Sequence, residues 1–142
     1  MHNHARSDSS ITRTCTCACG ALRVETSGEP MRVYLCFCHD CQKLSGTAFA
    51  YRAMFQLSQV NIIGRYTVWR RAGRSGGRLA FGFCPDCGST LFTWPEGRKD
   101  LLAISIGGFN DASFRPPDKA YWTARKHGWL ALPPDVETCE EQ

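Results

Sequence analysis

Short stretches of the chain alternate apolar with polar residues, and glycine or proline separates most of them. In residues 21–26, Leu22 and Val24 fall on one face of an extended segment, because side chains two positions apart point the same way. A similar β-like pattern recurs in seven further stretches, at 31–35, 48–55, 65–70, 78–83, 89–94, 101–106 and 120–125. Many short strands joined by glycine-rich turns predict a mainly all-β domain.

The remaining pattern predicts one short helical turn at residues 40–46, and Gly46 ends it. A chain of this length is most simply one domain with one core. We expect a flexible polar lead at 1–14, a folded domain at 15–134 and a frayed acidic tail at 135–142. The polar lead has no apolar signal segment, and no apolar run approaches the roughly 18 residues of a membrane span. These features predict a cytoplasmic protein that has no membrane partner.

Composition changes the picture mainly through cysteine. The 142 residues include nine cysteines, an odd number, and nothing marks the chain as secreted. Clustered thiols in a reducing compartment indicate metal binding or catalysis rather than disulfides. The formal charge of +4 is mildly basic. Two zinc sites with four and three thiolates would lower it to about +1, which argues against a nucleic-acid partner.

The strongest local signal is the pair Cys84 and Cys87 in "CPDCGS". Two cysteines three apart, followed by Gly88, are typical of a zinc knuckle, in which a tight turn directs both sulfurs to one metal and the glycine takes a positive φ. A thioredoxin-like redox pair is the alternative. That motif precedes a long helix, whereas the strand-like stretch 89–94 follows here, so the sequence favours zinc.

A structural zinc site takes four ligands, so a second cysteine pair is required. Upstream lies "CTCACG", with Cys15, Cys17 and Cys19. In an extended strand, residues two apart face the same side, so a C-x-C pair can present both sulfurs to one ion. Gly20 follows Cys19 as a glycine follows the later pair, which favours Cys17 and Cys19 as the ligands. Cys15 is then a spare thiol, and Cys139 near the C-terminus is an incidental one.

Three further cysteines, Cys36, Cys38 and Cys41, form a C-x-C-x-x-C run. A turn between Cys38 and Cys41 would gather the three sulfurs around one point. Three protein ligands leave a tetrahedral zinc one short, which is the mark of catalytic rather than structural zinc. Two alternatives stay open: a buried reduced cluster without metal, and a fourth ligand from His39, which its place inside the turn makes awkward.

Taken together, these motifs resemble the glutathione-dependent formaldehyde-activating enzyme family, whose domain also occurs in centromere protein V. The resemblance rests on the three cysteine motifs and on flanking pieces that extend it from about residue 17 to about residue 133. These pieces are "DCQKLSGTAF" (40–49), "FGFCPDCGSTLF" (81–92) and "GGFND" (107–111). The chain departs from the family pattern at Phe37 and at Lys119, where the family often has histidine.

The resemblance implies a zinc-binding β-tent fold of small antiparallel sheets, with two zinc ions per chain. It assigns Cys17, Cys19, Cys84 and Cys87 to a structural zinc. It assigns Cys36, Cys38 and Cys41 to a catalytic-type zinc. The implied activity is a carbon–sulfur lyase reaction that, in the opposite direction, adds glutathione to formaldehyde to give S-hydroxymethylglutathione. The implied partners are therefore a small thiol and a small aldehyde.

The chemistry of an open zinc site agrees with that activity, because a bound cation stabilises the thiolate form of a thiol. Glutathione also needs cations for its two carboxylates, and the sequence offers Arg65, Arg70, Arg71, Arg74 and Lys43. One alternative is a non-enzymatic, zinc-stabilised binding module, for which the basic block 70–78 is the cue; that block can equally be a hairpin loop. Another alternative is a thiol redox protein.

Overall fold

The computed structural model describes residues 11–73 and 77–141. Residues 1–10, most of the predicted lead, lie outside the described residues, as do residues 74–76 of the basic block. The lead was predicted to extend to residue 14, and this boundary is wrong, because the first strand begins at Thr12. The division into a lead, a domain and a tail otherwise stays a prediction.

Strands are the commonest regular structure in the described chain. They are β1 (Thr12–Thr16), β2 (Arg23–Ser27), β3 (Arg32–Cys36), β4 (Ala50–Gln56), β5 (Val60–Ile63), β6 (Thr67–Ala72), β7 (Arg78–Phe83), β8 (Thr90–Pro95), β9 (Leu101–Ser105), β10 (Lys119–Tyr121) and β11 (Glu137–Cys139). The helix α2 (His39–Ser45) follows β3, and three 3-10 helices lie elsewhere: η1 (Leu57–Gln59), η2 (Ile106–Phe109) and η3 (Thr123–Arg125).

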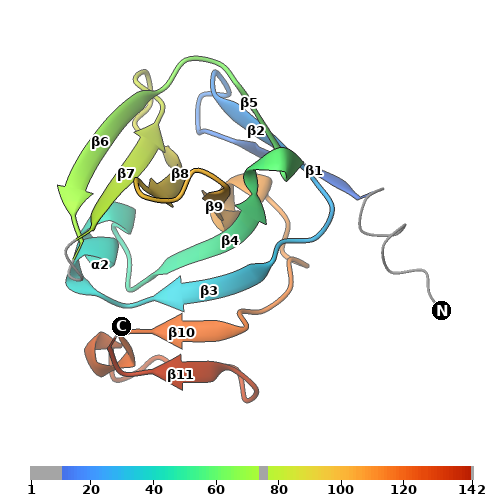
Figure 1. The fold of residues 1–142 in the computed structure, drawn as a ribbon. Coiled ribbons are helices and arrows are strands. Elements are labelled where there is room, and N and C mark those ends of the chain that lie inside the picture. Colours follow the sequence, from blue (N-terminus) through green and yellow to red (C-terminus); the bar gives the residue numbers. More distant parts are fainter. Residues whose placement is uncertain (1–10, 74–76, 142) are drawn as a thin grey trace.

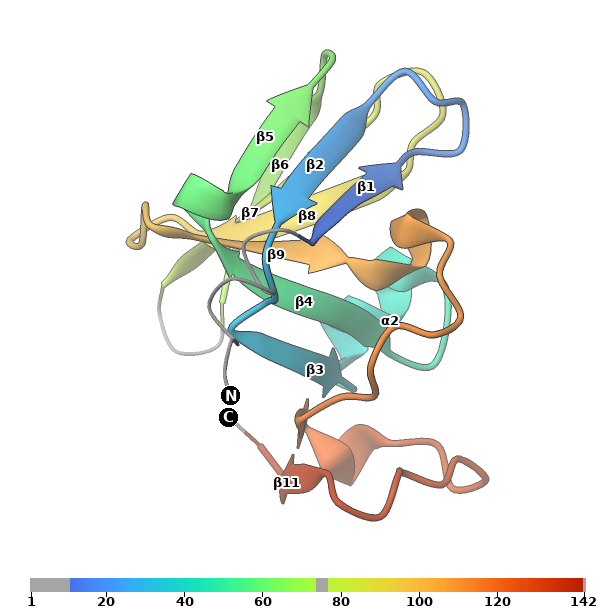
Figure 2. The same ribbon diagram turned by 90° about the vertical axis from the view of Figure 1, so that its right-hand side faces the viewer.

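Two sheets organise these strands (Figure 1). The long sheet has the order β11-β10-β3-β4-β9-β8-β7-β6, and the small sheet has the order β1-β2-β5. Most neighbours are antiparallel, whereas β10 runs parallel to both β3 and β11. The prediction of a mainly β fold with one short helix is confirmed. Figure 2 shows the small sheet above β4 and β3 of the long sheet.

All eight stretches predicted as strands contain a strand, but the sequence pattern missed β1, β5 and β11. The stretch 120–125 is split, because Trp122 takes a left-handed conformation with φ of 61° and begins the turn η3. The expectation of a frayed tail is wrong for Glu137–Cys139, which pair in parallel with β10.

The long sheet presents chemically different side chains on its two faces. On β4, Ala53 and Phe55 belong to the main hydrophobic core, which also contains Leu22 and Val24 of the small-sheet region. The alternating residues Arg52 and Met54 line a cavity instead. Because side chains two apart share a face, one side of the sheet is covered by the small sheet and the other side is free to build a site.

A second, smaller core lies at the end of β3. Phe37 is fully buried there and packs with Ala120, Trp122 and residues of the C-terminal segment, including Leu130. This core supports α2, whose N-cap is Cys38 and which ends at Gly46, as predicted. No helix among residues 11–73 and 77–141 is long and apolar enough to cross a membrane.

Candidate metal centres

Two turns, far apart in the sequence, bring together Cys17, Cys19, Cys84 and Cys87. All four Sγ atoms lie within 4.8 Å of one another. The Sγ atom of Cys19 lies 3.7 Å from that of Cys17 and 3.7 Å from that of Cys84. Four sulfurs at the usual Zn–S distance of about 2.3 Å in a tetrahedron would be about 3.8 Å apart. The sulfur spacing therefore fits a tetrahedral zinc ion.

Each pair lies in a tight turn that a glycine completes. The Gly20 N–H donates to the Cys17 carbonyl at 3.1 Å, and the Gly88 N–H donates to the Cys84 carbonyl at 2.8 Å. Both glycines have positive φ, 83° and 82°, so the positive φ expected at Gly88 is confirmed. The extended C-x-C geometry was wrong: β1 ends at Thr16, and Cys17 and Cys19 lie in the turn after it.

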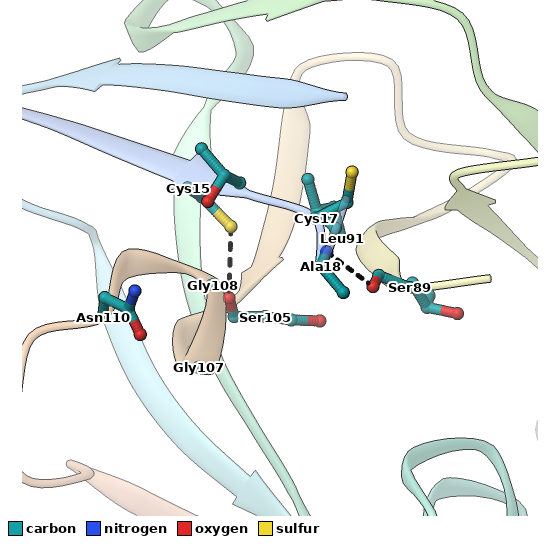
Figure 3. Close-up of a pocket in the computed structure, with 11 residues that line it drawn as sticks. Cys15, Cys17, Ala18, Ser89, Leu91, Ser105, Gly107, Gly108 and Asn110 are labelled. Carbon is teal, nitrogen blue, oxygen red and sulfur yellow. Dashed lines mark hydrogen bonds between the residues drawn. The ribbon is translucent and has the colours of Figure 1, made fainter. Parts of the chain in front are cut away.

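Hydrogen bonds join the two turns and support the sulfurs. The Ala18 N–H donates to the Ser89 hydroxyl at 3.0 Å (Figure 3), and the Leu22 N–H donates to Cys17 Sγ at 3.2 Å. The Ser89 hydroxyl also lies 3.3 Å from Cys87 Sγ. Hydrogen bonds from the Ser89 side chain and backbone lower the pKa of Cys87 to about 5. These donors favour the thiolate that a metal requires.

Cys15 lies beside this cluster but points elsewhere. It is fully buried, and its Sγ donates to the Ser105 carbonyl at 3.5 Å, on the far side of the strand from the Cys17 sulfur (Figure 3). Burial, together with the nearby charge of Cys17, raises the pKa of Cys15 to about 12. The structure leaves Cys15 out of the four-sulfur group. Cys139, on β11, donates to the Glu141 carbonyl and is likewise outside both groups.

The second cluster comes from one short segment. Cys36 ends β3, Cys38 is the N-cap of α2 and Cys41 lies in the first turn of α2, and their Sγ atoms all lie within 4.8 Å of one another. The Cys41 N–H donates to Cys38 Sγ at 3.3 Å. His39 is not part of this group, and its Nδ1 lies 3.1 Å from Arg125 Nη1. Among the described residues, the group therefore has three candidate ligands.

Charge within this cluster concentrates on one sulfur. Hydrogen bonds from Cys36 and Cys38, and to a smaller extent the guanidinium of Arg52, lower the pKa of Cys41 to about 2. The same contacts with Cys38 and Cys41, together with burial, raise the pKa of Cys36. These contacts favour the thiolate form of Cys41, which is the form that binds a metal.

A cavity of about 350 Å³ adjoins the three-cysteine cluster on the free face of the long sheet. Four residues lie in one row across the sheet, each paired with the next: Met54 on β4, Ala103 on β9, Thr93 on β8 and Phe81 on β7. These side chains share one face, and the small Ala103 and Thr93 leave the space. The N-terminal turn of α2 lines one side of the cavity. There Asp40 forms an ion pair with Arg71 of β6 at 3.4 Å.

The cavity is strongly cationic. Among residues 11–73 and 77–141, five arginines line it and Asp40 is the only carboxylate in the lining; the arginines are Arg32, Arg52, Arg71, Arg78 and Arg125. Of the cations proposed from sequence that the structure describes, Arg71 is in this lining, whereas Arg65, Arg70 and Lys43 are not. Arg65 and Arg70 form ion pairs with Asp86 and Glu96 on the surface. Arg74 lies outside the described residues.

Sequence reasoning missed the other four arginines because they come from four separate segments. Arg32 and Arg52 alternate with core residues on β3 and β4, and this alternation is the signal that could have placed them on the free face. The basic block 70–78 does not form a separate patch in the part that the structure describes. Its ends Arg70 and Arg78 both form ion pairs with Glu96.

Comparison with known proteins gives one family. The sequence model of the glutathione-dependent formaldehyde-activating enzyme matches residues 12–125, most of the chain and both cysteine clusters. The chain belongs to the glutathione-dependent formaldehyde-activating enzyme family. This confirms the resemblance noted in the sequence and supports an enzymatic function of that type. A search of curated proteins found no match.

Among solved structures, this member of the glutathione-dependent formaldehyde-activating family is similar to a crystal structure of a protein from Rhodobacter sphaeroides. The two share 19% identity with a TM-score of 0.54, and the match covers 72% of this chain and 91% of that one. At this identity the likeness concerns the fold alone. It agrees with the two-sheet architecture described above.

Proposed function

We propose that this chain catalyses carbon–sulfur chemistry of the family type, joining a small thiol such as glutathione to formaldehyde or another small aldehyde. The observation that carries the proposal is the position of the three-cysteine cluster, which opens onto a cationic cavity. A site with three sulfurs and adjoining space can admit a substrate thiol, whereas four sulfurs complete a tetrahedral shell.

The two clusters have different proposed roles. Cys17, Cys19, Cys84 and Cys87 hold a structural zinc that ties together two distant turns. Cys36, Cys38 and Cys41 hold a catalytic-type zinc. Zinc bound there would supply positive charge that favours the deprotonated, nucleophilic form of a thiol. The chain would therefore hold two zinc ions.

Two cavity arginines are proposed to bind the carboxylates of glutathione. Arg32 donates to the Tyr121 hydroxyl at 2.5 Å, and Arg125 pairs with His39 and stacks on the Trp122 ring. Neither forms an ion pair with a carboxylate among the described residues. Arg71 and Arg78 already face Asp40 and Glu96. The charges of Arg32 and Arg125 are therefore available to an acidic ligand.

One experiment tests both the metal content and the reaction. Purified protein is analysed for zinc per chain, and formaldehyde consumption is then followed with glutathione and with a neutral thiol, 2-mercaptoethanol. We expect about two zinc ions per chain and consumption that is faster with glutathione. The variant Arg125→Gln should raise the KM for glutathione while leaving that for 2-mercaptoethanol nearly unchanged.

A zinc-loaded protein that accelerates neither reaction contradicts the enzyme proposal. The non-enzymatic binding module would then be the better interpretation. Zinc at one ion per chain, held only by the four-cysteine cluster, would count against the catalytic metal but not against the fold.

A further inference from the structure

Arg52 occupies an unusual position for a charged side chain. It lies in the middle of β4, and only 8% of its surface is exposed. Its Nη1 donates to Cys41 Sγ at 3.6 Å, and its register partner Tyr34 lies beside it on β3. Its guanidinium is also 5.9 Å from the centre of the Phe81 ring, within the cavity lining. The charge is thus buried at the point where the cavity meets the three-cysteine cluster.

The contacts that Arg52 makes do not use its full hydrogen-bonding capacity. A guanidinium has five N–H donors, and a buried cation is costly unless anions or acceptors surround it. Arg52 donates to the Cys41 sulfur and lies beside Tyr34 in the sheet register, and it forms no ion pair with a carboxylate among the described residues. Nearby charges of Tyr34 and Cys41 raise its pKa against the cost of burial, so it stays a cation.

We propose that Arg52 is a catalytic residue that donates hydrogen bonds to the aldehyde oxygen while the carbon–sulfur bond forms. This inference rests on the proposed thiol–aldehyde reaction. The substrate sulfur donates an electron pair to the carbonyl carbon, the C=O π pair moves onto oxygen, and the resulting alkoxide takes a proton from water. In the reverse direction the oxygen loses its proton and the C–S bond breaks. In both directions the oxygen carries negative charge in the transition state, beside the Arg52 guanidinium.

Arg71 shows why the position matters more than the charge. It lines the same cavity and lies over the same Phe81 ring, at 5.4 Å from its centre. Its guanidinium, however, is paired with Asp40, and it makes no hydrogen bond to a cysteine sulfur. Only Arg52 combines burial, contact with the cluster and the absence of a carboxylate partner within the described residues. Arg71 is therefore a matched control.

The test compares Arg52→Gln, Arg52→Lys and Arg71→Gln with the wild type. Loss of one oxyanion donor lowers kcat by about 10²- to 10³-fold in other enzymes, and we expect a loss of that order in Arg52→Gln. Arg52→Lys keeps the charge without the planar fork and should lose less. Arg71→Gln removes a charge of the cavity lining but no contact with a cysteine sulfur, so its effect should appear mainly in KM, and kcat should fall far less than in Arg52→Gln.

A measurement other than activity separates catalysis from metal binding. Zinc content and the shift that glutathione causes in the spectrum of the cobalt-substituted protein should be the same in Arg52→Gln and the wild type. Millimolar guanidinium should restore part of kcat in Arg52→Ala and should have no such effect on the Arg71 variant. An unchanged kcat in Arg52→Gln, or loss of the metal or of the thiol-induced shift, overturns the assignment. In the latter case Arg52 serves the metal rather than the substrate.

A wild-type protein without activity would contradict the proposed function. A second probe then tests separately whether Arg52 binds an oxyanion. Formate is a planar oxyanion small enough for the site, and its binding can be followed by calorimetry on the zinc-loaded protein. Formate binding that disappears in Arg52→Gln but persists in Arg71→Gln would support an oxyanion-binding role for Arg52, even if the chain does not catalyse the proposed reaction. Binding that is equal in all variants, or absent from the wild type, overturns it.

Discussion

The two cysteine clusters consist of the same type of side chain but differ in the number of sulfurs and in their separation along the chain. The four-cysteine cluster joins two turns whose members Cys19 and Cys84 are 65 residues apart. The three-cysteine cluster spans only residues 36–41 at the end of one strand and the start of one helix. The first holds distant parts of the chain together, whereas the second adds little connectivity. The comparison teaches that ligand number and chain separation distinguish a stabilising cluster from a reactive one.

The two clusters also differ in the charge of the groups around them. Neutral donors support the four sulfurs, namely the Leu22 N–H and the Ser89 hydroxyl. A cation, Arg52, contacts the three-cysteine cluster, which faces a cavity with four further arginines. Neutral donors suit a complete tetrahedral shell, whereas positive charge in an adjoining cavity suits an incoming anion.

The largest expected effect is loss of the fold when the four-cysteine cluster is broken. In Cys84→Ser the pair of turns loses a ligand whose side chain is fully buried. A structural zinc contributes on the order of 10 kcal/mol, comparable to the whole stability of a domain. We expect insoluble protein, or protein without a cooperative thermal transition by circular dichroism.

The matched control for this experiment is Cys139→Ser, because Cys139 lies outside both clusters. It should melt within about 1 °C of the wild type, since surface substitutions cost little. A folded Cys84→Ser protein with the melting temperature of the wild type would refute the structural role of this cluster.

Breaking the three-cysteine cluster should have a smaller effect on stability and a large one on activity. In Cys38→Ser we expect a folded protein with about one zinc per chain fewer and no measurable thiol–aldehyde activity. The fold persists because this cluster closes only a six-residue segment, and Phe37, Ala120 and Trp122 still pack together. Unfolding of Cys38→Ser to the same extent as Cys84→Ser would remove the distinction between the clusters.

Much of this contrast could be predicted from the sequence, because cysteine spacing is a local property. The Cys84–Cys87 turn and the three-residue spacing of Cys38 and Cys41 depend only on nearby backbone geometry. The alternation of Ala53 and Phe55 with Arg52 could also have indicated a two-faced strand, a feature that the predictions from sequence did not include. Which distant side chains meet Arg52 could not be predicted, because the strand order β4-β9-β8-β7 depends on tertiary packing. The cavity is a product of that order.

Chelation should separate the clusters by ligand number, because three thiolates leave a coordination position that a chelator can occupy. We expect a mild chelator such as EDTA to remove one zinc per chain first, together with activity, while the thermal transition is largely kept. The three-cysteine cluster lines a cavity that a small molecule can enter. Zinc release can be followed with a coloured indicator, and Cys38→Ser should lack the fast phase. Loss of both ions at one rate would contradict a difference in ligand number between the clusters.

The smallest expected effect concerns Cys15, which tests where the four-cysteine cluster ends. Its sulfur is fully buried, and a Cβ added at Gly108 would collide with it, so Cys15 fills space between β1 and η2. In Cys15→Ala, removal of one buried sulfur should cost about 1 kcal/mol, measured by urea denaturation, because the cavity it leaves is about the size of a methyl group. Zinc content should stay at the wild-type value, since the Cys15 sulfur points to the Ser105 carbonyl. A fall in zinc by one ion per chain in Cys15→Ala, but not in Cys17→Ala, would make Cys15 rather than Cys17 a ligand of this cluster.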